Sequence, residues 1–546
     1  MPKRRGSDPP ARRPVKRQRP AKPDHLSSLS DEVLLEILSF LPISTLASCQ
    51  RLSKRFHDLA GDSELWKQKY YTRWVLPRSR QALRFKHSII SSLGTPYSPR
   101  VSKWPGHSHL ATDGKRPNWK TQFRLRHNWS KGTCRFGALE VSRPPLPQIH
   151  MKLYSGVVVT ADEEHGLRAW STKASRKQLT ALSFPNAGDK PTALFMTRGS
   201  VASNIEVTVG FDDGHFEIYD LDVTLAKFVL RFSQASSSSS STDDDASITA
   251  IASSPPFVLA ISQHKVFSLY RLPHSSADAP TLLASLESSN TFAPVSLSLR
   301  CSASEVTASI AYSFFHISGG WTVGIQELRF NQDGERIGSR LASTAAFQDR
   351  TQISSGTASS SRSRLIRHME APTSISYSHP YLLTSHNDNT LTMYLVSSSA
   401  DKLSIRTGRR LWGHTSSVTS VQVGDRGKAV SISPRGNEIR IWELESAVSA
   451  RFNNNNNNSN SRTNLRSTMR EESSVQIAAE KHAASAAASV ETTSGAMNWG
   501  REIVQAECEA LMPGKVGGCV MFDEEQVVVL RERDCRTQLL ECYDFT

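Results

Sequence analysis

Hydrophobic residues near the N-terminus of this 546-residue chain recur at helical spacing. Four of them stand at i, i+3, i+4 and i+7, which predicts one apolar helical face: Leu34, Ile37, Leu38 and Leu41. Ser30 stands at the expected N-cap position, followed by two acidic residues that the helix dipole favours. Pro42 predicts the end of this helix, because proline has no amide hydrogen to donate.

Apolar residues also occupy a second flank of this helix and continue beyond it. Val33 and Phe40 form the flank, and a further helical pattern runs from Leu46 to Leu59. Leu65-Trp66 follows after a break at Gly61-Asp62. A bundle this small cannot bury so much apolar surface by itself. The pattern therefore predicts that the segment is one half of a protein interface.

The segment from Leu29 to Trp66 resembles an F-box. The positions that match the family pattern are Leu29, Glu32, Val33, Leu34, Ile37, Leu38, Ser39, Phe40, Leu41, Pro42, Leu46, Leu65 and Trp66. Ser30 departs from the usual proline, and Phe56 from a common tryptophan. The alternative to an F-box is an ordinary helical hairpin with a similar apolar pattern.

The F-box resemblance implies binding to a Skp-type adaptor, and through it to a cullin–RING ubiquitin ligase. The adaptor-binding residues carried over by position are Leu29, Val33, Leu34, Ile37, Leu38, Leu41, Pro42, Leu46, Leu52 and Trp66.

From residue 136 onward the pattern changes to short β-rich runs separated by turn residues. The clearest unit, Gly413–Glu445, resembles one blade of a WD-repeat β-propeller. Asp213-Gly214 and Asp388-Asn389 precede similar strands, because a turn of this kind favours an Asp acceptor followed by Gly or Asn. We expect about seven blades, near residues 137–170, 191–222, 247–272, 295–330, 372–396, 414–445 and 502–546.

The repeat pattern is degenerate, so the resemblance to WD repeats is weaker than the resemblance to an F-box. Gly436 stands where the turn Asp is expected in the clearest blade, and His414 is expected to hydrogen-bond within that blade. The run Cys134–Val141 is expected to supply the outer strand that closes the ring with the last blade.

The predicted fold class is multidomain, with α-helical N-terminal parts followed by an all-β propeller. A basic tail (1–24), an F-box (25–75), a helical linker (76–135) and the propeller (136–546) follow one another. Three inserts of low complexity are expected to be disordered because they lack apolar residues: 234–246, 351–364 and 451–497. Within the last insert, Ser473–Val490 is expected to be transiently helical.

The linker contains a helical pattern from Asn118 to Trp129 in which aromatic residues alternate with arginine. Aromatic rings beside arginine suit stacking on RNA bases. Packing on a neighbouring domain is the preferred interpretation, since aromatic rings dominate such contacts.

The net charge of +15 is concentrated at the N-terminus. Residues 1–23 carry nine Lys or Arg and one Asp. Two basic clusters resemble a bipartite nuclear localisation signal, which implies importin as a partner: Lys3, Arg4, Arg5, Arg12, Arg13, Lys16, Arg17 and Arg19. The alternative is nonspecific contact with nucleic acid. We expect the protein in the nucleus, the cytoplasm or both, and no membrane span, since no run of eighteen apolar residues occurs.

No catalytic motif is recognisable, and we expect no cofactor and no metal. Cys508, Cys519, Cys535 and Cys542 lack the close spacing of a zinc site. Arginines of the propeller, among them Arg409, Arg410, Arg426 and Arg435, suit a phosphorylated substrate but are interpreted as solvated loop residues.

The sequence thus predicts a non-catalytic substrate-recognition subunit of an SCF-type cullin–RING ligase. It would bind the adaptor through the F-box and a protein substrate through the propeller. The alternatives are a WD-repeat scaffold without a ligase role, a nucleic-acid-associated protein, and an enzyme whose site matches no known motif.

Overall fold

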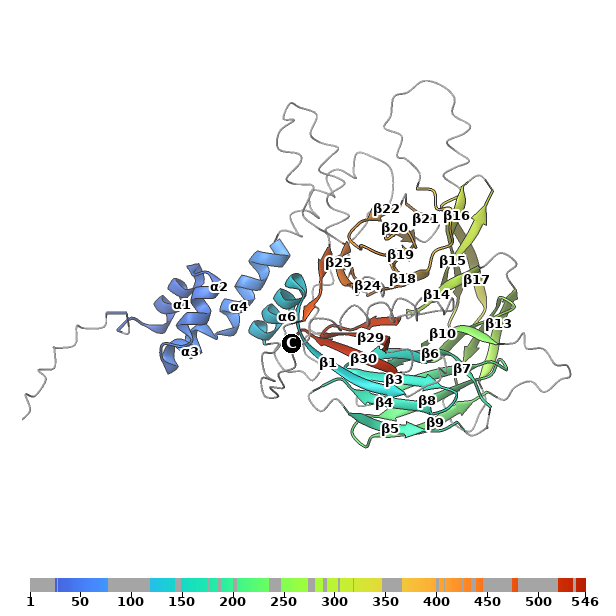
Figure 1. Ribbon diagram of the computed structural model, residues 1–546, viewed down its shortest axis with the longest axis horizontal. Coiled ribbons are helices and arrows are strands. Elements are labelled where there is room, and N and C mark those ends of the chain that lie inside the picture. The colour runs from blue at the N-terminus through green and yellow to red at the C-terminus, as the bar shows by residue number, and fades with distance from the viewer. Residues whose placement is uncertain are drawn as a thin grey trace, which may run out of the picture. The chain divides into compact units, whose positions relative to one another are not determined.

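The computed structural model describes most of the predicted elements of the chain (Figure 1). The described residues are 25–26, 28–76, 118–142, 149–173, 177–184, 188–199, 204–234, 247–273, 280–287, 292–302, 305–317, 319–345, 366–398, 402–406, 408–424, 427–433, 438–444, 474–479, 519–533 and 537–546. They belong to two compact units, which divide between Phe123 and Arg124 within helix α6 (Trp119–Lys131). The basic tail and most of residues 76–118 lie outside the described residues.

The first unit is helical and begins where the sequence predicts a helix. Its elements are α1 (Asp31–Phe40), α2 (Ile43–Cys49), α3 (Lys54–Ala60), α4 (Ser63–Tyr70), the π-helical segment η1 (Tyr71–Val75) and the first residues of α6. Helix α1 ends two residues before Pro42, as expected for a residue that cannot continue the backbone hydrogen bonds. Leu38, Leu46, Ala60 and Leu65 form the core of this unit.

The second unit is a β-propeller, in which the described strands form seven sheets. Blade 1 contains β2 (His150–Tyr154), β3 (Val157–Asp162), β4 (Gly166–Ser171) and β5 (Gln178–Leu182). Blade 2 contains β6 (Pro191–Arg198), β7 (Asn204–Phe211), β8 (Phe216–Asp222) and β9 (Lys227–Ser233). Blade 3 contains β10 (Ile248–Ser254), β11 (Phe257–Ser262), β12 (Val266–Arg271) and β13 (Thr281–Glu287).

The remaining blades follow the same antiparallel order. Blade 4 contains β14 (Phe292–Cys301), β15 (Val306–His316), β16 (Gly320–Phe330) and β17 (Arg336–Ser343). Blade 5 contains β18 (Ser374–Ser378), β19 (Tyr381–Ser385), β20 (Leu391–Ser398), β21 (Leu403–Ile405) and β22 (Arg409–Leu411). Blade 6 contains β23 (Ser420–Val423), β24 (Lys428–Ser433), β25 (Glu438–Glu443) and β26 (Ser474–Gln476).

Blade 7 closes the ring with strands from both ends of the propeller segment. It contains β28 (Cys519–Phe522), β29 (Gln526–Arg533), β30 (Thr537–Asp544) and β1 (Thr133–Ser142), with β27 (Ala478–Ala479) at its edge. The register pairs Phe136 of β1 with Tyr543 of β30. The prediction that Cys134–Val141 closes the ring is therefore confirmed.

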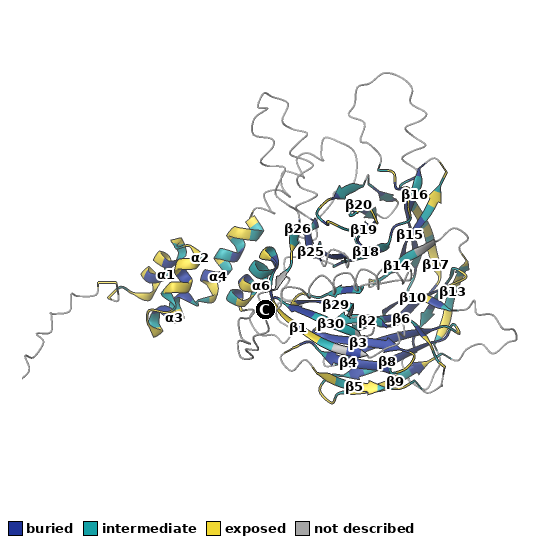
Figure 2. Ribbon diagram, in the orientation of Figure 1, coloured by how far each residue is buried: buried dark blue, intermediate teal, exposed yellow. Residues whose placement is uncertain are grey.

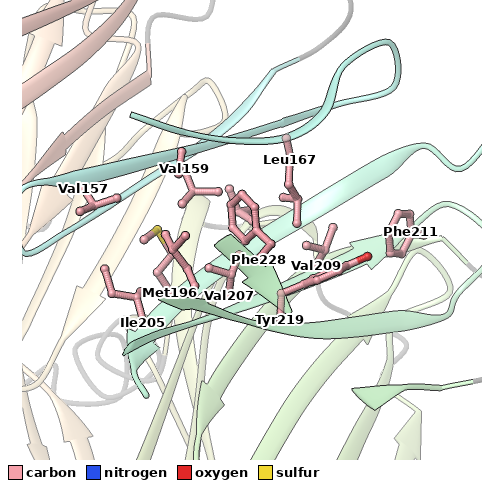
Figure 3. Packing of buried hydrophobic residues seen from close by; sticks show 14 residues of the cluster. Val157, Val159, Leu167, Met196, Ile205, Val207, Val209, Phe211, Tyr219 and Phe228 are labelled. Atoms are coloured by element: carbon pink, nitrogen blue, oxygen red, sulfur yellow. The ribbon is translucent and has the colours of Figure 1, made fainter. Parts of the chain in front are cut away.

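Buried side chains of neighbouring blades pack against each other between the sheets (Figure 3). Between blades 1 and 2, Val159 and Leu167 belong to the same cluster as Val207, Phe211 and Tyr219. Each middle strand is covered on both faces, so its sequence is almost continuously apolar. Every residue of β3 is buried, for example.

In blades 1 to 6 the outer strand was not part of the predicted ranges, whereas the outer strand of blade 7, β1, was. The predicted range 191–222 covers β6, β7 and β8 and omits β9. Strands β9 and β13 mix exposed residues with buried or half-buried ones, and each pairs with a neighbour along one edge only. Their sequences are therefore too polar to stand out from the loops around them.

One predicted insert contains strands, which corrects the expectation of disorder across 451–497. Residues 474–476 form β26, which pairs with β25, and residues 478–479 form β27, which pairs in parallel with Thr133 and Cys134 of β1. The same residues contradict a helix over the first part of Ser473–Val490. The rest of this insert, residues 235–246 and residues 351–364 lie outside the described residues.

Candidate functional site

The interior of the helical bundle holds several of the residues predicted to bind an adaptor. Leu34, Leu38, Leu46 and Trp66 are all buried. The indole N–H of Trp66 donates to the carbonyl oxygen of Ala60 at 2.8 Å, which joins α4 to the end of α3. These side chains hold the bundle together in the structure.

Polar side chains fix the ends of the helices. Asp62 accepts from the N–H groups of Glu64 and Leu65 at 2.9 and 3.1 Å, so it caps α4. Ser53 caps α3 by accepting from the N–H of Phe56 at 3.2 Å. Ser30 occupies the N-cap position of α1 as predicted, but its side chain makes no capping hydrogen bond.

Two basic residues that the sequence analysis did not single out bind backbone oxygens of α1 or its flanks. The ammonium group of Lys69 donates to the carbonyl oxygens of Ser39 and Leu41 at 2.6 and 2.8 Å, and burial lowers the pKa of Lys69. The guanidinium of Arg55 donates to the carbonyl oxygen of Leu29 at 2.6 Å and to the Asp31 carboxylate at 2.7 Å. Helix α1 is thereby held at both ends, which orients its outer face.

The outer face of α1 is apolar and exposed (Figure 2). Val33, Ile37 and Phe40 stand at i, i+4 and i+7, which places them on one side of the helix, and they are 47%, 39% and 78% exposed. Leu52, between α2 and α3, is 68% exposed. Exposed apolar side chains grouped on one helix of such a small unit are typical of protein interaction sites. We call Val33, Ile37, Phe40 and Leu52 the outer apolar surface.

The structure thus divides the ten predicted adaptor-binding residues by position. Four are interior, as described above; Val33, Ile37, Pro42 and Leu52 are exposed; Leu29 and Leu41 are half-buried. Phe40 was missing from the predicted contacts, although its spacing from Val33 and Ile37 was the available signal. Binding by all ten stays a prediction.

The bundle also contains an aromatic cluster that includes the first residues of α6. Phe56, at the position where tryptophan is common in the family pattern, is buried. The ring of Phe123 lies 5.2 Å from that of Trp66 and 4.7 Å from that of Trp74. Trp119 lies 5.5 Å from Tyr70. Since Trp119 and Phe123 are buried, their rings are not available to stack on RNA bases.

The second part of α6 packs within the propeller unit. Trp129 is buried and stacks on Phe545 with ring centroids 4.1 Å apart. Its indole N–H donates to the carbonyl oxygen of Glu524 at 2.9 Å. In the structure the aromatic side chain of Trp129 packs on the propeller, in agreement with the preferred interpretation of this helix.

The blade turns contain the hydrogen bonds predicted from the repeat pattern. Asp213 accepts from the N–H of His215 at 3.1 Å, with Gly214 at a positive φ of 86°. Asp388 accepts from the N–H of Thr390 at 3.3 Å, with Asn389 at φ 61°. These aspartates therefore stabilise turns of the propeller.

Blade 6 uses an acid that the sequence analysis overlooked. His414 contacts the Ser431 hydroxyl at 2.6 Å, and the indole N–H of Trp442 donates to the same hydroxyl at 2.8 Å. Glu438 accepts from the N–H of Thr415 at 2.9 Å and lies 3.3 Å from the His414 ring. Glu438 thus takes the role expected of an aspartate near Gly436. That this blade is a WD repeat stays a prediction.

Four histidines of the propeller are held neutral by burial, which lowers the pKa of His150, His368 and His414 to about 4 and that of His386 to about 3. Above pH 6.5 such a histidine is neutral in both the folded and the unfolded chain. As the pH falls from 6.5 toward 4, only the unfolded chain binds a proton at this histidine, so the free energy of unfolding decreases. We expect the wild-type propeller to lose roughly 2 kcal/mol more unfolding free energy between pH 7 and pH 5 than a His150→Gln variant. Urea unfolding of both proteins at the two pH values measures the difference; an equal change in both would contradict it.

Other candidate chemistry is sparse in the described part of the chain. Arg410 lies 3.6 Å from the Asp388 carboxylate, and Arg409 lies in β22. Among the described residues, no group of three or more His, Cys, Asp or Glu is placed to hold a metal ion. None of the described helices is long and apolar enough to cross a membrane. The predicted nuclear signal, Cys508, Cys535, Arg426 and Arg435 lie outside the described residues.

Comparison with known proteins matches both units. A family model described as F-box-like matches residues 26–72, and one described as the F-box protein pof12 beta-propeller matches residues 134–546. F-box protein pof12 of Schizosaccharomyces pombe is 22% identical over 445 residues, which cover 79% of this chain and 86% of that protein. F-box protein dre-1 of Caenorhabditis elegans is 40% identical over 47 residues, which cover 9% of this chain and 5% of that protein. Among solved structures, BamB from Moraxella catarrhalis aligns at 10% identity over 75% of this chain and all of that one, with a TM-score of only 0.36.

Proposed function

The chain belongs to the family of F-box proteins with a pof12-type β-propeller, and on this premise we propose that it is the substrate-recognition subunit of an SCF-type cullin–RING ubiquitin ligase. The F-box would bind a Skp-type adaptor, and the propeller would bind a protein substrate. The protein itself would catalyse no reaction. It would raise the local concentration of substrate lysines near the ubiquitin-charged enzyme.

The outer apolar surface is the observation that supports this proposal most strongly. Val33, Ile37 and Phe40 are exposed on a helix whose opposite face already fills the bundle core. Burying these side chains against a partner would be favourable by about 25 cal/mol per Å² of apolar surface removed from water. The match to the F-box-like family model supports a Skp-type adaptor as this partner.

Protein turnover in cells tests the receptor role. Cells carrying either the wild-type chain or an Ile37→Glu/Phe40→Glu variant would be compared for protein half-lives and for proteins bound to the purified propeller. We expect a set of proteins that bind the propeller in both cases and are degraded faster only with the wild-type chain. If no propeller-bound protein changes its half-life, the receptor role is wrong.

We also propose that residues 1–23 direct the protein to the nucleus through importin, since they carry two basic clusters. Deleting these residues is expected to move a fluorescent fusion from the nucleus to the cytoplasm. Replacing only Lys3, Arg4 and Arg5 by alanine is expected to have most of this effect, because a bipartite signal needs both clusters. Microscopy of the three fusions measures the distribution, and nuclear fluorescence that survives the deletion would contradict the proposal.

A further inference from the structure

Helix α1 ends in a turn that cannot complete its own hydrogen bonds. The backbone leaves helical geometry at Leu41, where ψ is 146°, and the next residue is Pro42, which has no N–H to donate. The N–H of Leu41 bonds back to the carbonyl oxygen of Leu38 at 3.2 Å. The carbonyl oxygens after Leu38 have no N–H four residues later within the same helix, so their donors must come from elsewhere.

A lysine of α4 provides these donors. The Lys69 ammonium group donates to the carbonyl oxygen of Ser39 at 2.6 Å and to that of Leu41 at 2.8 Å. Lys69 is half-buried, and among the described residues it makes no ion pair with a carboxylate. Its charge therefore lies at the C-terminal end of α1, where the helix dipole favours a cation. The end of α1 is thus closed by a side chain from a helix that comes later in the chain.

The two oxygens that Lys69 binds lie on either side of Phe40. This residue is 78% exposed, more than any other member of the outer apolar surface. The Ser39 carbonyl belongs to the peptide group that precedes Phe40, and the Leu41 carbonyl belongs to the peptide group that follows Leu41. Lys69 therefore fixes, from both directions, the stretch of backbone that carries the Phe40 side chain.

We infer that Lys69 is a positioning residue for adaptor binding, which holds the end of α1 so that Phe40 meets the adaptor in one orientation. Without the ammonium group, the turn after Phe40 could adopt several conformations, and binding would have to select one of them. Ordering the backbone of a single residue costs about as much as a tenfold change in affinity. This inference rests on the proposed function and adds to it a residue that acts through the outer apolar surface without belonging to it.

A double-mutant cycle on the full-length chain tests this inference, with affinity measured by calorimetric titration of a purified Skp-type adaptor. Lys69→Met is expected to weaken binding about tenfold in the wild-type background. Phe40→Ala removes the side chain that Lys69 positions, so adding Lys69→Met to it should weaken binding by less than about threefold further. Such coupling between the two substitutions is the result that a general loss of bundle stability would not produce.

Lys67→Met is the matched control on the same helix. The Lys67 ammonium group bonds the exposed Glu64 carboxylate at 3.0 Å, and surface ion pairs of this kind contribute little to stability. Lys67→Met removes one positive charge, as Lys69→Met does, and should change affinity by less than about twofold. Lys69→Arg keeps a charged donor group for the two carbonyl oxygens and should retain most of the wild-type affinity.

Circular dichroism at the temperature of the titration reports whether each variant keeps its helices. If Lys69→Met loses helical structure, Lys69→Gln takes its place in both backgrounds and is judged in the same way, since it removes the charge but keeps a polar end. The inference is overturned if the Lys69 variant binds the adaptor like the wild type. It is also overturned if the variant weakens binding by the same factor with and without the Phe40 ring.

The wild-type titration separates failure of this inference from failure of the proposed function. A wild-type chain that binds the adaptor, together with a folded Lys69 variant of equal affinity, would refute only the role of Lys69. A folded wild-type chain that binds no adaptor would refute the proposed function itself.

Discussion

The double substitution Ile37→Glu/Phe40→Glu is expected to weaken adaptor binding by at least about 100-fold while the helical bundle stays folded. Both side chains belong to the outer apolar surface and are exposed in the free protein, so their replacement removes little of the bundle core. In an apolar interface, two carboxylates would be buried without partners, and a loss of about 2.7 kcal/mol already corresponds to 100-fold.

Calorimetric titration of adaptor into the purified variant measures this loss, and circular dichroism reports whether the helices remain. Leu225→Glu, which charges an exposed leucine on the propeller, is the matched control and should bind adaptor like the wild type. Leu38→Ala should also bind poorly, but through loss of helical structure, since Leu38 lies in the core. Wild-type affinity in the double variant would show that the outer apolar surface does not bind the adaptor.

Trp129→Ala is expected to lower the unfolding free energy of the propeller by about 3–5 kcal/mol. The indole is buried, stacks on Phe545 with an interplanar angle of 16°, and bonds the Glu524 carbonyl oxygen. The Lys428 ammonium group lies 4.2 Å from its ring centroid. Removal of the side chain would leave a cavity between α6 and the last strand of blade 7.

Denaturant unfolding followed by propeller fluorescence measures this destabilisation. Trp129→Phe should have a smaller effect, because it keeps the stacking and loses mainly the hydrogen bond. Trp412→Ala, at an exposed tryptophan, is the matched control and should change stability by less than about 1 kcal/mol. Equal stability of the Trp129 and Trp412 variants would mean that α6 does not hold the propeller in the way described.

The helical unit could be located from sequence, because apolar residues at helical spacing end at a proline that stops the helix. The same pattern could not predict which of the apolar residues lie in the core of this unit and which lie on its surface. Leu34 and Val33 are both apolar and lie on faces about 100° apart. Only the positions of α3 and α4 decide that Leu34 is buried and Val33 is exposed. The sequence pattern therefore could not separate the interior leucines from the exposed apolar residues.

The propeller was predictable where strands are covered on both faces. The runs that became β7 and β24 are apolar because neighbouring blades pack on each side. The outer strand β13 and the three-residue β26 have no such pattern, since their pairing depends on partners distant in sequence. Glu438 was missed for a similar reason: it reaches Thr415 from a position later than the expected turn aspartate.

A calorimetric titration of the full-length chain with a purified Skp-type adaptor tests the central claim most directly. The account predicts one adaptor bound per chain with a Kd of about 1 μM or tighter, near −8 kcal/mol. It also predicts that the binding disappears when residues 25–76 are deleted and persists when residues 1–23 are deleted. No binding by a folded full-length chain, or equal binding without residues 25–76, would contradict it.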